Sequence, residues 1–380
     1  MMKTLSVIGS TGSIGVQTLQ VAGERGYAVC GLAAGKNGRV LEEQILRFRP
    51  RLAALFNEAE GRALRARLDG VCDTEILWGR EGVCRVAAMQ KADLTLNAAV
   101  GIAGLAPTVA ALAAGKPLAL ANKESLVCAG ALVCRMAREK GVPILPVDSE
   151  HNAIFQCLQS GKAEEIERIL LTASGGPFFG KTAQEIENMG PEQALRHPSW
   201  SMGAKITVDS ATMMNKGFEM IEAMYLFGVQ PRQIQVLIHR ESIVHSLVEF
   251  RDGSVLAQLS PPDMRLPIQY AVDYPTRMPS ARQRLDLTKA AALCFYPPDD
   301  TTFPAMALCR EVMERGGTLG AAVNGANEAA VAAFLAKKIP FGRITPLVWQ
   351  AAHAVRWLPE PTLEEIYETD RLARAAVNLE

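Results

Sequence analysis

The stretch Leu5-Ser6-Val7-Ile8, followed at once by Gly9-Ser10-Thr11-Gly12-Ser13-Ile14-Gly15, decides the fold. A short apolar run of this kind is typical of a buried strand, and a helical pattern begins directly after the glycines. Glycines at such a turn let the backbone approach a pyrophosphate, and the helix N-terminus adds free N–H donors. The spacing Gly-x-x-Gly-x-x-Gly departs from the usual fingerprint, so a merely structural turn remains the alternative.

The rest of the first 147 residues repeats this alternation of apolar runs and Ala/Leu/Arg-rich helical stretches. Each pair of runs is separated by a length that suits a crossover helix, which predicts a doubly wound, Rossmann-like parallel sheet in an α/β protein. The expected strands are residues 5–8, 28–32, 52–56, 94–98, 118–121 and 144–147.

Beyond residue 149 the pattern changes. Longer apolar runs at 166–172, 235–238 and 254–259 are mixed with helical stretches, which predicts an α+β domain. Prolines and irregular periodicity then indicate a linker, and the end of the chain is rich in Ala, Leu and Glu at helical spacing, which predicts a helical bundle. The expected domains are 1–149, 150–274 and 301–380, with a linker at 275–300.

Composition excludes several classes of function. The 380 residues carry 40 basic and 40 acidic side chains, so no overall charge attracts nucleic acid or an anionic membrane. The most apolar region, residues 94–121, is broken by Asn97, Pro107 and Lys116, which argues against a membrane span. Because the N-terminus runs straight into the first strand without a targeting pattern, we expect a cytoplasmic protein.

The end of the second expected strand indicates which dinucleotide is preferred. An NAD-preferring site usually places an acid there to hold the ribose 2′-hydroxyl. The segment 31–39 has no acid and carries Lys36 and Arg39, which would favour a 2′-phosphate. We therefore expect NADPH, the alternative being that these cations are solvated loop charges.

Two carboxylates follow the last strand of the first domain. Asp148 and Glu150 are two residues apart, so on an extended chain both would point to the same side at the ligand-binding edge of the sheet. Such oxygen donors suit Mg²⁺ or Mn²⁺. Because Asp-x-Glu is more often a solvated turn, a third acid is needed.

The third acid is expected in the segment 210–222. Read as a helix, this segment places Asn215, Lys216 and Glu219 on one face, with Ser210 at the helix entry. An amide, an ammonium and a carboxylate on one face can hold a phosphate at one end and a metal at the other. The alternative is an exposed Lys216–Glu219 pair of little consequence.

Long motifs give the chain a resemblance to the 1-deoxy-D-xylulose 5-phosphate reductoisomerase family over essentially its whole length. They occur in the family's order, and His239-Arg240-Glu241-Ser242 departs from the His-Pro-Gln-Ser form of some members. The motifs are GSTGSIG (9–15), AAGKN (33–37), NAAVG (97–101), LANKESLV (120–127), PVDSEHNAIFQ (146–156), LTASGGPF (171–178), HPSWSMG (197–203), DSATMMNKGFEMIEA (209–223) and PDMRLPI (262–268).

The resemblance implies a role for each matching position. It makes the first domain NADPH-binding and the second catalytic, with metal and substrate sites. The implied metal ligands are Asp148, Glu150 and Glu219, and these with Lys123 are the implied catalytic residues. The implied substrate contacts are Ser149, Glu150, Ser174, His197, Trp200, Ser210, Asn215, Lys216 and Glu219. The implied NADPH contacts are Thr11, Gly12, Ser13, Ile14, Gly35, Lys36, Asn37, Asn122, Lys123, Glu124, Gly203 and Met264.

The implied reaction is NADPH- and metal-dependent rearrangement and reduction of 1-deoxy-D-xylulose 5-phosphate to 2-C-methyl-D-erythritol 4-phosphate, in non-mevalonate isoprenoid synthesis. The metal would be Mg²⁺ or Mn²⁺, with Co²⁺ as a further choice, and the enzyme a homodimer. A retro-aldol and aldol pair and a direct ketol shift both stay open as the route. Two other functions also stay open: an NADP-dependent dehydrogenase of the semialdehyde or homoserine type, and a non-catalytic dinucleotide sensor.

Overall fold

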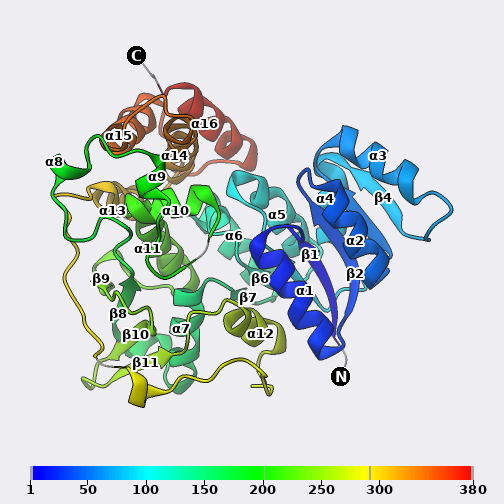
Figure 1. Cartoon of the computed structure of the whole chain (residues 1–380), viewed down its shortest axis with the longest axis horizontal. Helices are drawn as coiled ribbons and strands as arrows, with labels where there is room; N and C mark the ends of the chain where they lie inside the picture. Colours follow the sequence, from blue (N-terminus) through cyan, green and yellow to red (C-terminus); the bar gives the residue numbers. More distant parts are fainter. Residues whose placement is uncertain (1–2, 201, 291, 378–380) are drawn as a thin grey trace. The chain divides into compact units, whose positions relative to one another are not determined.

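The computed structural model describes residues 3–200, 202–290 and 292–377 (Figure 1). The chain forms two compact units. The first consists of Met1–Ser125, Ala131–Asn152 and Asp263–Arg282. The second consists of Leu126–Gly130, Ala153–Pro262 and Gln283–Glu380.

The first unit is built on a seven-stranded parallel sheet in the order β4-β3-β2-β1-β5-β6-β7. The order reverses at β1, so two halves wind away from it, and this confirms the predicted doubly wound fold. The strands are β1 Thr4–Ile8, β2 Ala28–Ala34, β3 Leu52–Leu55, β4 Glu75–Trp78, β5 Leu94–Asn97, β6 Leu118–Leu120 and β7 Ile144–Pro146. All of these were expected except β4.

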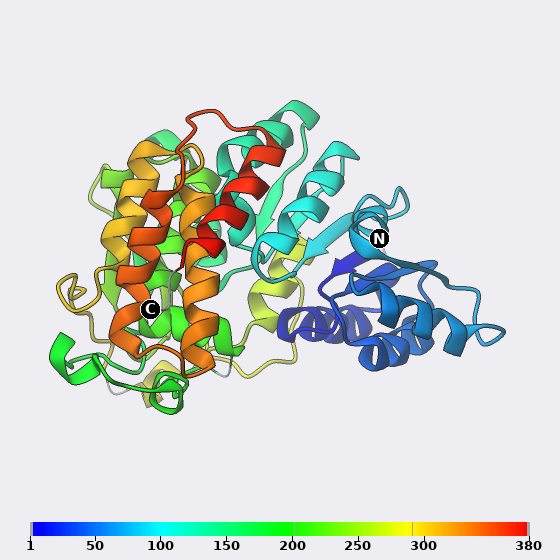
Figure 2. The ribbon, with the colours of Figure 1, turned by 90° about the horizontal axis from the view of Figure 1, so that it is seen from above.

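Helices lie on both faces of this sheet (Figure 2). Helices α4 and α5 pack together on one face, and α1 packs beside α12. The helices are α1 Ser13–Arg25, α2 Gly38–Phe48, α3 Glu58–Leu68, α4 Gly79–Ala87, α5 Leu105–Ala113, α6 Glu124–Lys140, α7 Ser149–Cys157 and α12 Arg265–Asp273. Helix α6 is kinked at Ala129, and both α6 and α7 contribute residues to the two units.

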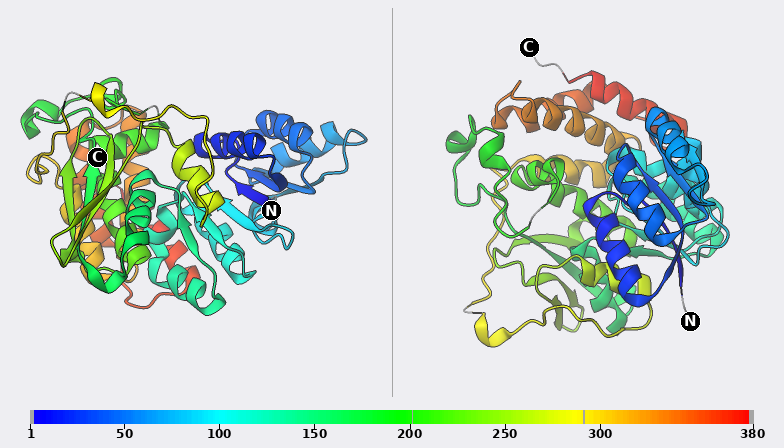
Figure 3. Two further views of the ribbon diagram at one scale, coloured as in Figure 1. Left: turned by 90° about the horizontal axis from the view of Figure 1, so that it is seen from below. Right: turned by 45° about the vertical axis from the view of Figure 1, so that its right-hand side comes forward.

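The second unit contains a four-stranded mixed sheet in the order β11-β10-β8-β9 (Figure 3, left). Strands β8 and β9 are parallel and the other pairs are antiparallel. The bounds are β8 Ile166–Ala173, β9 Ile234–Ile238, β10 Val244–Phe250 and β11 Val255–Leu259. Strand β10 was not expected from sequence. The sheet shares one apolar core with the helices of this unit, and Leu171, Val248 and Phe218 all belong to it.

The C-terminal part of the second unit is helical, as predicted. Helix α14 is almost entirely buried, and its Asn324 donates to Oδ1 of Asp370 on α16 at 2.9 Å. The helices of this unit are α8 Ala183–Ile186, α9 Pro191–Ala194, α10 Ala204–Ala211, α11 Met214–Phe227, α13 Ala305–Arg315, α14 Leu319–Leu335, α15 Ile344–Ala354 and α16 Leu363–Ala375. Single 3-10 turns occur at Gly101–Gly104, Leu158–Ser160, Ala163–Glu165, Pro231–Gln233, Leu287–Lys289 and Phe341–Arg343.

The two units divide the chain differently from the domains expected at 1–149, 150–274 and 301–380, because α12 packs with the first unit and the helices after residue 301 share a core with the second. That three-domain division stays a prediction. In the expected linker, the described residues 275–290 and 292–300 are largely exposed and irregular. Within the described ranges, no helix is long and apolar enough to cross a membrane.

Candidate active site

The glycine turn after β1 is a close-packed turn that opens onto the start of α1. A Cβ atom on Gly9, whose φ is +78°, would lie 2.4 Å from the carbonyl oxygen of Ala98. A Cβ on Gly15 would lie 2.2 Å from the carbonyl oxygen of Gly9. Among the described residues, no side chain caps α1 at Gly12, and the first turn carries no acid. The N–H donors and the helix dipole are therefore available to an anion.

The carboxyl end of β2 lies beside this turn. The backbone N–H groups of Gly9 and Ser10 both donate to the carbonyl oxygen of Ala33, at 2.8 and 2.9 Å. Lys36 and Arg39 are exposed just beyond this contact. The segment 35–39, which follows β2, therefore carries positive charge and contains no acid, as the sequence indicated. The neighbouring Gly35 is exposed and Asn37 caps α2. Thr11 lies in the turn before α1, and Ser13 and Ile14 are the first two residues of that helix.

Asn122 fixes the loop between β6 and α6. Its Nδ2 atom donates to the carbonyl oxygens of Ala99 and Gly101, at 2.8 and 3.0 Å, and to Oε2 of Glu124 at 3.0 Å. Its Oδ1 atom accepts from the backbone N–H of Ser125 at 3.1 Å. Asn122 and Glu124 are both buried. The next residue in this loop, Lys123, is therefore held on a rigid backbone.

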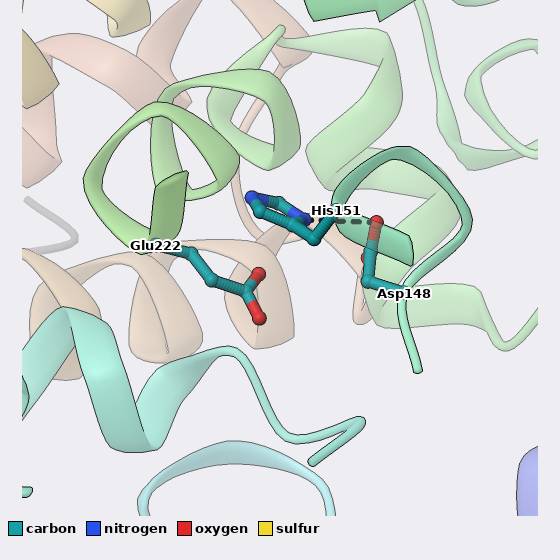
Figure 4. Close-up of side chains that lie close together, drawn as sticks. All are labelled: Asp148, His151 and Glu222. Atoms are coloured by element: carbon teal, nitrogen blue, oxygen red, sulfur yellow. Dashed lines mark hydrogen bonds and ion pairs between the residues drawn. The ribbon is translucent and has the colours of Figure 1, made fainter. Parts of the chain in front are cut away.

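Lys123 and Asp148 form a nearly buried ion pair. The Nζ atom of Lys123 lies 2.9 Å from Oδ2 of Asp148, and the two side chains are only 7% and 13% exposed. The other carboxylate oxygen, Oδ1, lies 3.2 Å from Nδ1 of His151 (Figure 4). Burial would raise the pKa of Asp148, but the Lys123 ammonium and the His151 contact outweigh it and lower that pKa well below its usual value. Asp148 is therefore an anion at neutral pH.

The local geometry of Glu150 corrects the extended chain expected from sequence. Helix α7 begins at Ser149, immediately after Asp148, so Glu150 stands on a first helical turn. The cause is capping: Oδ1 of Asp148 accepts from the backbone N–H of Glu150 at 3.3 Å. The hydroxyl of Ser149 donates to Oε2 of Glu150. These two carboxylates, with Lys123 and Ser149, form the acidic end of the first unit's candidate site.

In the second unit, α11 presents one buried polar face. Asn215 donates to Oε1 of Glu219, and Lys216 donates to Oε2 of the same carboxylate. Lys216 is 4% exposed and Glu219 1% exposed, so the pair is not the solvated surface pair that was the alternative. The spacings of three and four residues bring the three side chains together as predicted.

The position of Ser210 at the entry of this helix, expected from the sequence, is wrong. Ser210 lies in the last turn of α10, which ends at Ala211, while α11 starts at Met214. The break is made by Met213, whose φ of +63° is incompatible with one continuous helix. Ser210 therefore belongs to a separate element that precedes the polar face.

Ser174 and His197 form a hydrogen-bonded pair, and the turn that follows Ser174 lies close to the backbone of Ser210. Oγ of Ser174 lies 2.9 Å from Nε2 of His197. The positive φ of Gly176 turns the chain so tightly that a Cβ there would lie 2.7 Å from the carbonyl oxygen of Ser210. The Ser174–Gly176 turn, the His197 loop and the end of α10 thus form one polar cluster within the second unit.

Nδ1 of His197 accepts hydrogen bonds, which sets its tautomer. The backbone N–H groups of Ser199 and Trp200 donate to Nδ1 at 3.2 and 2.9 Å. Since Nδ1 accepts, the ring proton of the neutral imidazole is on Nε2, which faces Ser174. Burial, and then the charge of Arg240, lower the pKa of His197 to about 4. His197 is therefore a neutral Nε2–H donor at physiological pH.

Three further residues were implied as ligand contacts: Trp200 for the substrate, and Gly203 and Met264 for NADPH. The ring of Trp200 is 6.2 Å from that of His245. Gly203 is exposed and precedes α10, and Met264 precedes α12 in the first unit. Ser201, which belongs to the same motif as Trp200 and Gly203, lies outside the described residues.

Some residues that shape these clusters were given no role from sequence. His151 supports Asp148, and the Asn152 amide donates to the carbonyl oxygens of Pro146 and Pro267, at 2.8 and 3.2 Å, which ties β7 to α12. The position of His151, three residues after the helix-capping Asp148, is the signal that could have found it. Arg240, on the turn after β9, donates to the carbonyl oxygen of Ser174, and local sequence carries no signal for that contact.

The parallel sheet, the uncapped helix after a close-packed glycine turn and the cations beyond β2 define the first unit as a dinucleotide-binding domain of the doubly wound class. Family models agree with this class and narrow it. Residues 5–130 match 1-deoxy-D-xylulose 5-phosphate reductoisomerase, residues 144–227 match the C-terminal domain of that enzyme, and residues 259–376 match a further DXP reductoisomerase C-terminal domain.

Named relatives match over nearly their full length. A 1-deoxy-D-xylulose 5-phosphate reductoisomerase from Chlorobaculum tepidum is 52% identical over 377 residues, 98% of each chain. One from Pelotomaculum thermopropionicum is 50% identical over 375 residues, 98% of this chain and 97% of the relative. The chain therefore belongs to the 1-deoxy-D-xylulose 5-phosphate reductoisomerase family, and it is an oxidoreductase.

Solved structures of the family share the fold. The Zymomonas mobilis enzyme in complex with NADPH superposes with a TM-score of 0.92 at 41% identity, covering 99% of this chain and 98% of that one. A DOX-P reductoisomerase in complex with NADPH, fosmidomycin and magnesium gives a TM-score of 0.93 at 40% identity, covering 99% of this chain and 97% of that one.

Proposed function

We propose that this protein converts 1-deoxy-D-xylulose 5-phosphate into 2-C-methyl-D-erythritol 4-phosphate, using NADPH and a divalent metal ion, in non-mevalonate isoprenoid synthesis. One observation carries the proposal: a chain 40% identical over nearly the whole length is a DOX-P reductoisomerase that binds NADPH, fosmidomycin and magnesium. The buried polar clusters of the two units contain carboxylates that suit a magnesium ion and hydrogen-bond donors that suit a phosphate-like ligand.

For the cofactor, we assign the pyrophosphate to the start of α1 and the 2′-phosphate to Lys36 and Arg39. The supporting observations are the uncapped helix at Gly12 and the exposed cations that follow β2. NADPH supplies the hydride when bound. The further proposed contacts are Thr11, Ser13, Ile14, Gly35, Asn37, Asn122, Lys123, Glu124, Gly203 and Met264.

For the metal, we propose that Asp148, Glu150 and Glu219 are the ligands. The donor chemistry fits, because carboxylate oxygens are the ligands that Mg²⁺ and Mn²⁺ prefer. Asp148 is ionised, and the Glu219 carboxylate is presented by a rigid helical face. A divalent ion supplies positive charge where negative charge develops on the substrate's oxygens. Co²⁺ is a further choice with the same ligands.

The chain's own residues orient these carboxylates and bind the substrate. Lys123 holds Asp148 and adds a second positive charge near the reacting carbons, while the Ser149 hydroxyl fixes Glu150. For the phosphate we propose hydroxyl, amide, imidazole and ammonium donors, with Trp200 covering them. The proposed phosphate contacts are Ser174, His197, Ser210, Asn215 and Lys216. The Ser174 and His197 donors are already paired at 2.9 Å, so little ordering is needed on binding.

We also propose that the enzyme is a cytoplasmic homodimer. Strand β11 is an edge of the second unit's sheet, and its Val255 and Leu256 are 46% and 39% exposed, which favours pairing with a second copy. Sedimentation equilibrium should give twice the chain mass of 41.0 kDa. A single species at the chain mass would contradict the dimer, and recovery of the native protein in a membrane fraction would contradict the location.

The test of the activity is to follow NADPH absorbance with 1-deoxy-D-xylulose 5-phosphate, with and without Mg²⁺ or Mn²⁺. We expect NADPH oxidation that stops after thorough chelation and returns when the metal is restored. Full activity after chelation would favour an NADP-dependent dehydrogenase of the semialdehyde or homoserine type. NADPH binding without turnover of this or any other sugar phosphate would favour a dinucleotide sensor.

A further inference from the structure

Arg240 connects the turn after β9 to the Ser174–Gly176 turn. Its Nη1 atom donates to the carbonyl oxygen of Ser174 and to that of Gly176, each at 2.7 Å. Its guanidinium also lies over the ring of Phe179, 5.0 Å from the ring centroid. Two hydrogen bonds from a charged donor and a cation–π contact hold this side chain in one orientation.

The backbone that carries Arg240 is itself fixed. The N–H of His239 donates to the carbonyl oxygen of Ala173 at 2.7 Å, which joins this turn to the end of β8. Nε2 of His239 accepts from the N–H groups of Ile243 and Val244, at 3.3 and 3.1 Å, and the imidazole stacks on Phe295. A rigid turn therefore presents Arg240 to the Ser174 turn.

Arg240 also reaches the His197 loop. Its own carbonyl oxygen accepts from the Ser199 hydroxyl at 3.4 Å, and Ser199 is one of the two residues whose N–H groups hold Nδ1 of His197. The guanidinium contacts the turn of Ser174, and the carbonyl contacts the loop of His197. Arg240 thus contacts both segments that the hydrogen bond between Ser174 and His197 joins.

We propose that Arg240 is a positioning residue for the phosphate subsite: it locks the Ser174–Gly176 turn and the His197 loop so that their donors face the substrate's phosphate. The proposal rests on the proposed function.

The test compares Arg240→Met, Arg240→Lys and a control, Arg232→Met, which makes the same change at an exposed arginine of the same unit. Calorimetry measures the Kd of fosmidomycin, in the presence of NADPH and Mg²⁺, and the Kd of NADPH alone. Thermal unfolding reports the fold of each variant. Steady-state kinetics separates the KM of the sugar phosphate from kcat.

For Arg240→Met we expect the Kd of fosmidomycin and the KM of the sugar phosphate to rise about tenfold or more, since two charge-assisted hydrogen bonds are lost. The Kd of NADPH should stay within about twofold of the wild-type value in Arg240→Met. In the control Arg232→Met, both Kd values and the KM should stay within about twofold of the wild type. Arg240→Lys keeps the charge without the planar donor and should lie between the two. If Arg240→Met does not fold, this intermediate loss in Arg240→Lys carries the test.

An unchanged Kd of fosmidomycin in folded Arg240→Met overturns the inference. If only Arg240→Lys folds, an unchanged Kd in that variant overturns it instead. Neither result affects the proposed function. Equal weakening of fosmidomycin and NADPH would mean a general structural role, which also overturns it. If the wild-type protein binds no fosmidomycin and turns over no substrate, the proposed function fails and the inference fails with it.

Discussion

Oγ of Ser174 lies 2.9 Å from Nε2 of His197, and the opposite ring nitrogen accepts two backbone N–H groups. This arrangement requires a neutral imidazole with its proton on Nε2. Protonation of Nδ1 would break both backbone contacts. The electrostatics agree with the geometry, because burial and then the Arg240 charge lower the pKa of His197 to about 4.

We predict that His197 stays neutral down to about pH 4 in the folded protein, because its pKa is lowered to about 4 from the ordinary histidine value of 6.5. Between these values the unfolded chain binds a proton that the folded chain does not, so this residue makes the free energy of unfolding fall as the pH falls through that window. An NMR titration, assigned with His197→Gln, measures the pKa directly. A value near 6.5 would show that the imidazole is not held as described.

For cofactor choice, we expect Lys36→Ser combined with Arg39→Ser to lower kcat/KM for NADPH about thirtyfold and to leave that for NADH nearly unchanged, because two cations near the 2′-phosphate each contribute about 1 kcal/mol. Arg51→Ser is a matched control, since Arg51 is exposed and precedes β3 at the opposite edge of the sheet. Parallel losses with both dinucleotides would remove Lys36 and Arg39 from the 2′-phosphate site.

For substrate anchoring, Lys216→Ala should raise the KM of the sugar phosphate about thirtyfold, equivalent to about 2 kcal/mol. The same change leaves the 1%-exposed Glu219 without its ammonium partner, so the metal-free protein should lose about 3 kcal/mol of unfolding free energy. Urea denaturation measures this loss, and saturating Mg²⁺ should offset part of it if Glu219 is a ligand.

The control for this result is Lys205→Ala. Lys205 pairs with the buried Asp209 at 2.8 Å in the same unit, but Asp209 is not a proposed ligand. Its variant should therefore lose stability that Mg²⁺ does not restore. An equal response of the two variants to Mg²⁺, or an unchanged KM in Lys216→Ala, would contradict the assignment.

The sequence predicted most of the fold because its strands are apolar runs between clear helical patterns. Strand β4 was missed because it is an edge strand of the sheet in which only Ile76 is buried, so its pattern differs from that of the buried inner strands. Strand β10 was missed because its run contains His245 and Ser246, polar side chains that are nonetheless buried. Their burial is tolerated because β8 and Ser260 supply hydrogen-bond partners, which are distant in sequence.

At the candidate site, the sequence predicted one local arrangement correctly and two others wrongly. Spacing alone placed Asn215, Lys216 and Glu219 on one helical face, which the structure confirms. The extended Asp148–Glu150 segment was wrong because Asp148 caps a helix, and the entry position of Ser210 was wrong because Met213 breaks the helix. The contacts of Arg240 depend on long-range pairing of its turn with the end of β8, which no local pattern encodes.

The central claim is that Asp148, Glu150 and Glu219 hold one metal ion. Calorimetric titration of Mn²⁺ into the NADPH-bound protein tests it in Glu219→Gln, Asp148→Asn and the double variant. Glu249→Gln is the control, since Glu249 pairs with Arg168 on the surface of the second unit. Each single change removes an anionic ligand. The NADPH affinity of each variant shows whether its first unit is intact.

We expect each single change to weaken Mn²⁺ binding about a hundredfold, with the double variant losing far less than the product, because both residues act through one ion. Turnover at limiting Mn²⁺ should fall in parallel, while Glu249→Gln binds and reacts as the wild type does. Losses that multiply independently, or a Glu219→Gln protein with normal Mn²⁺ affinity and turnover, would contradict the shared site.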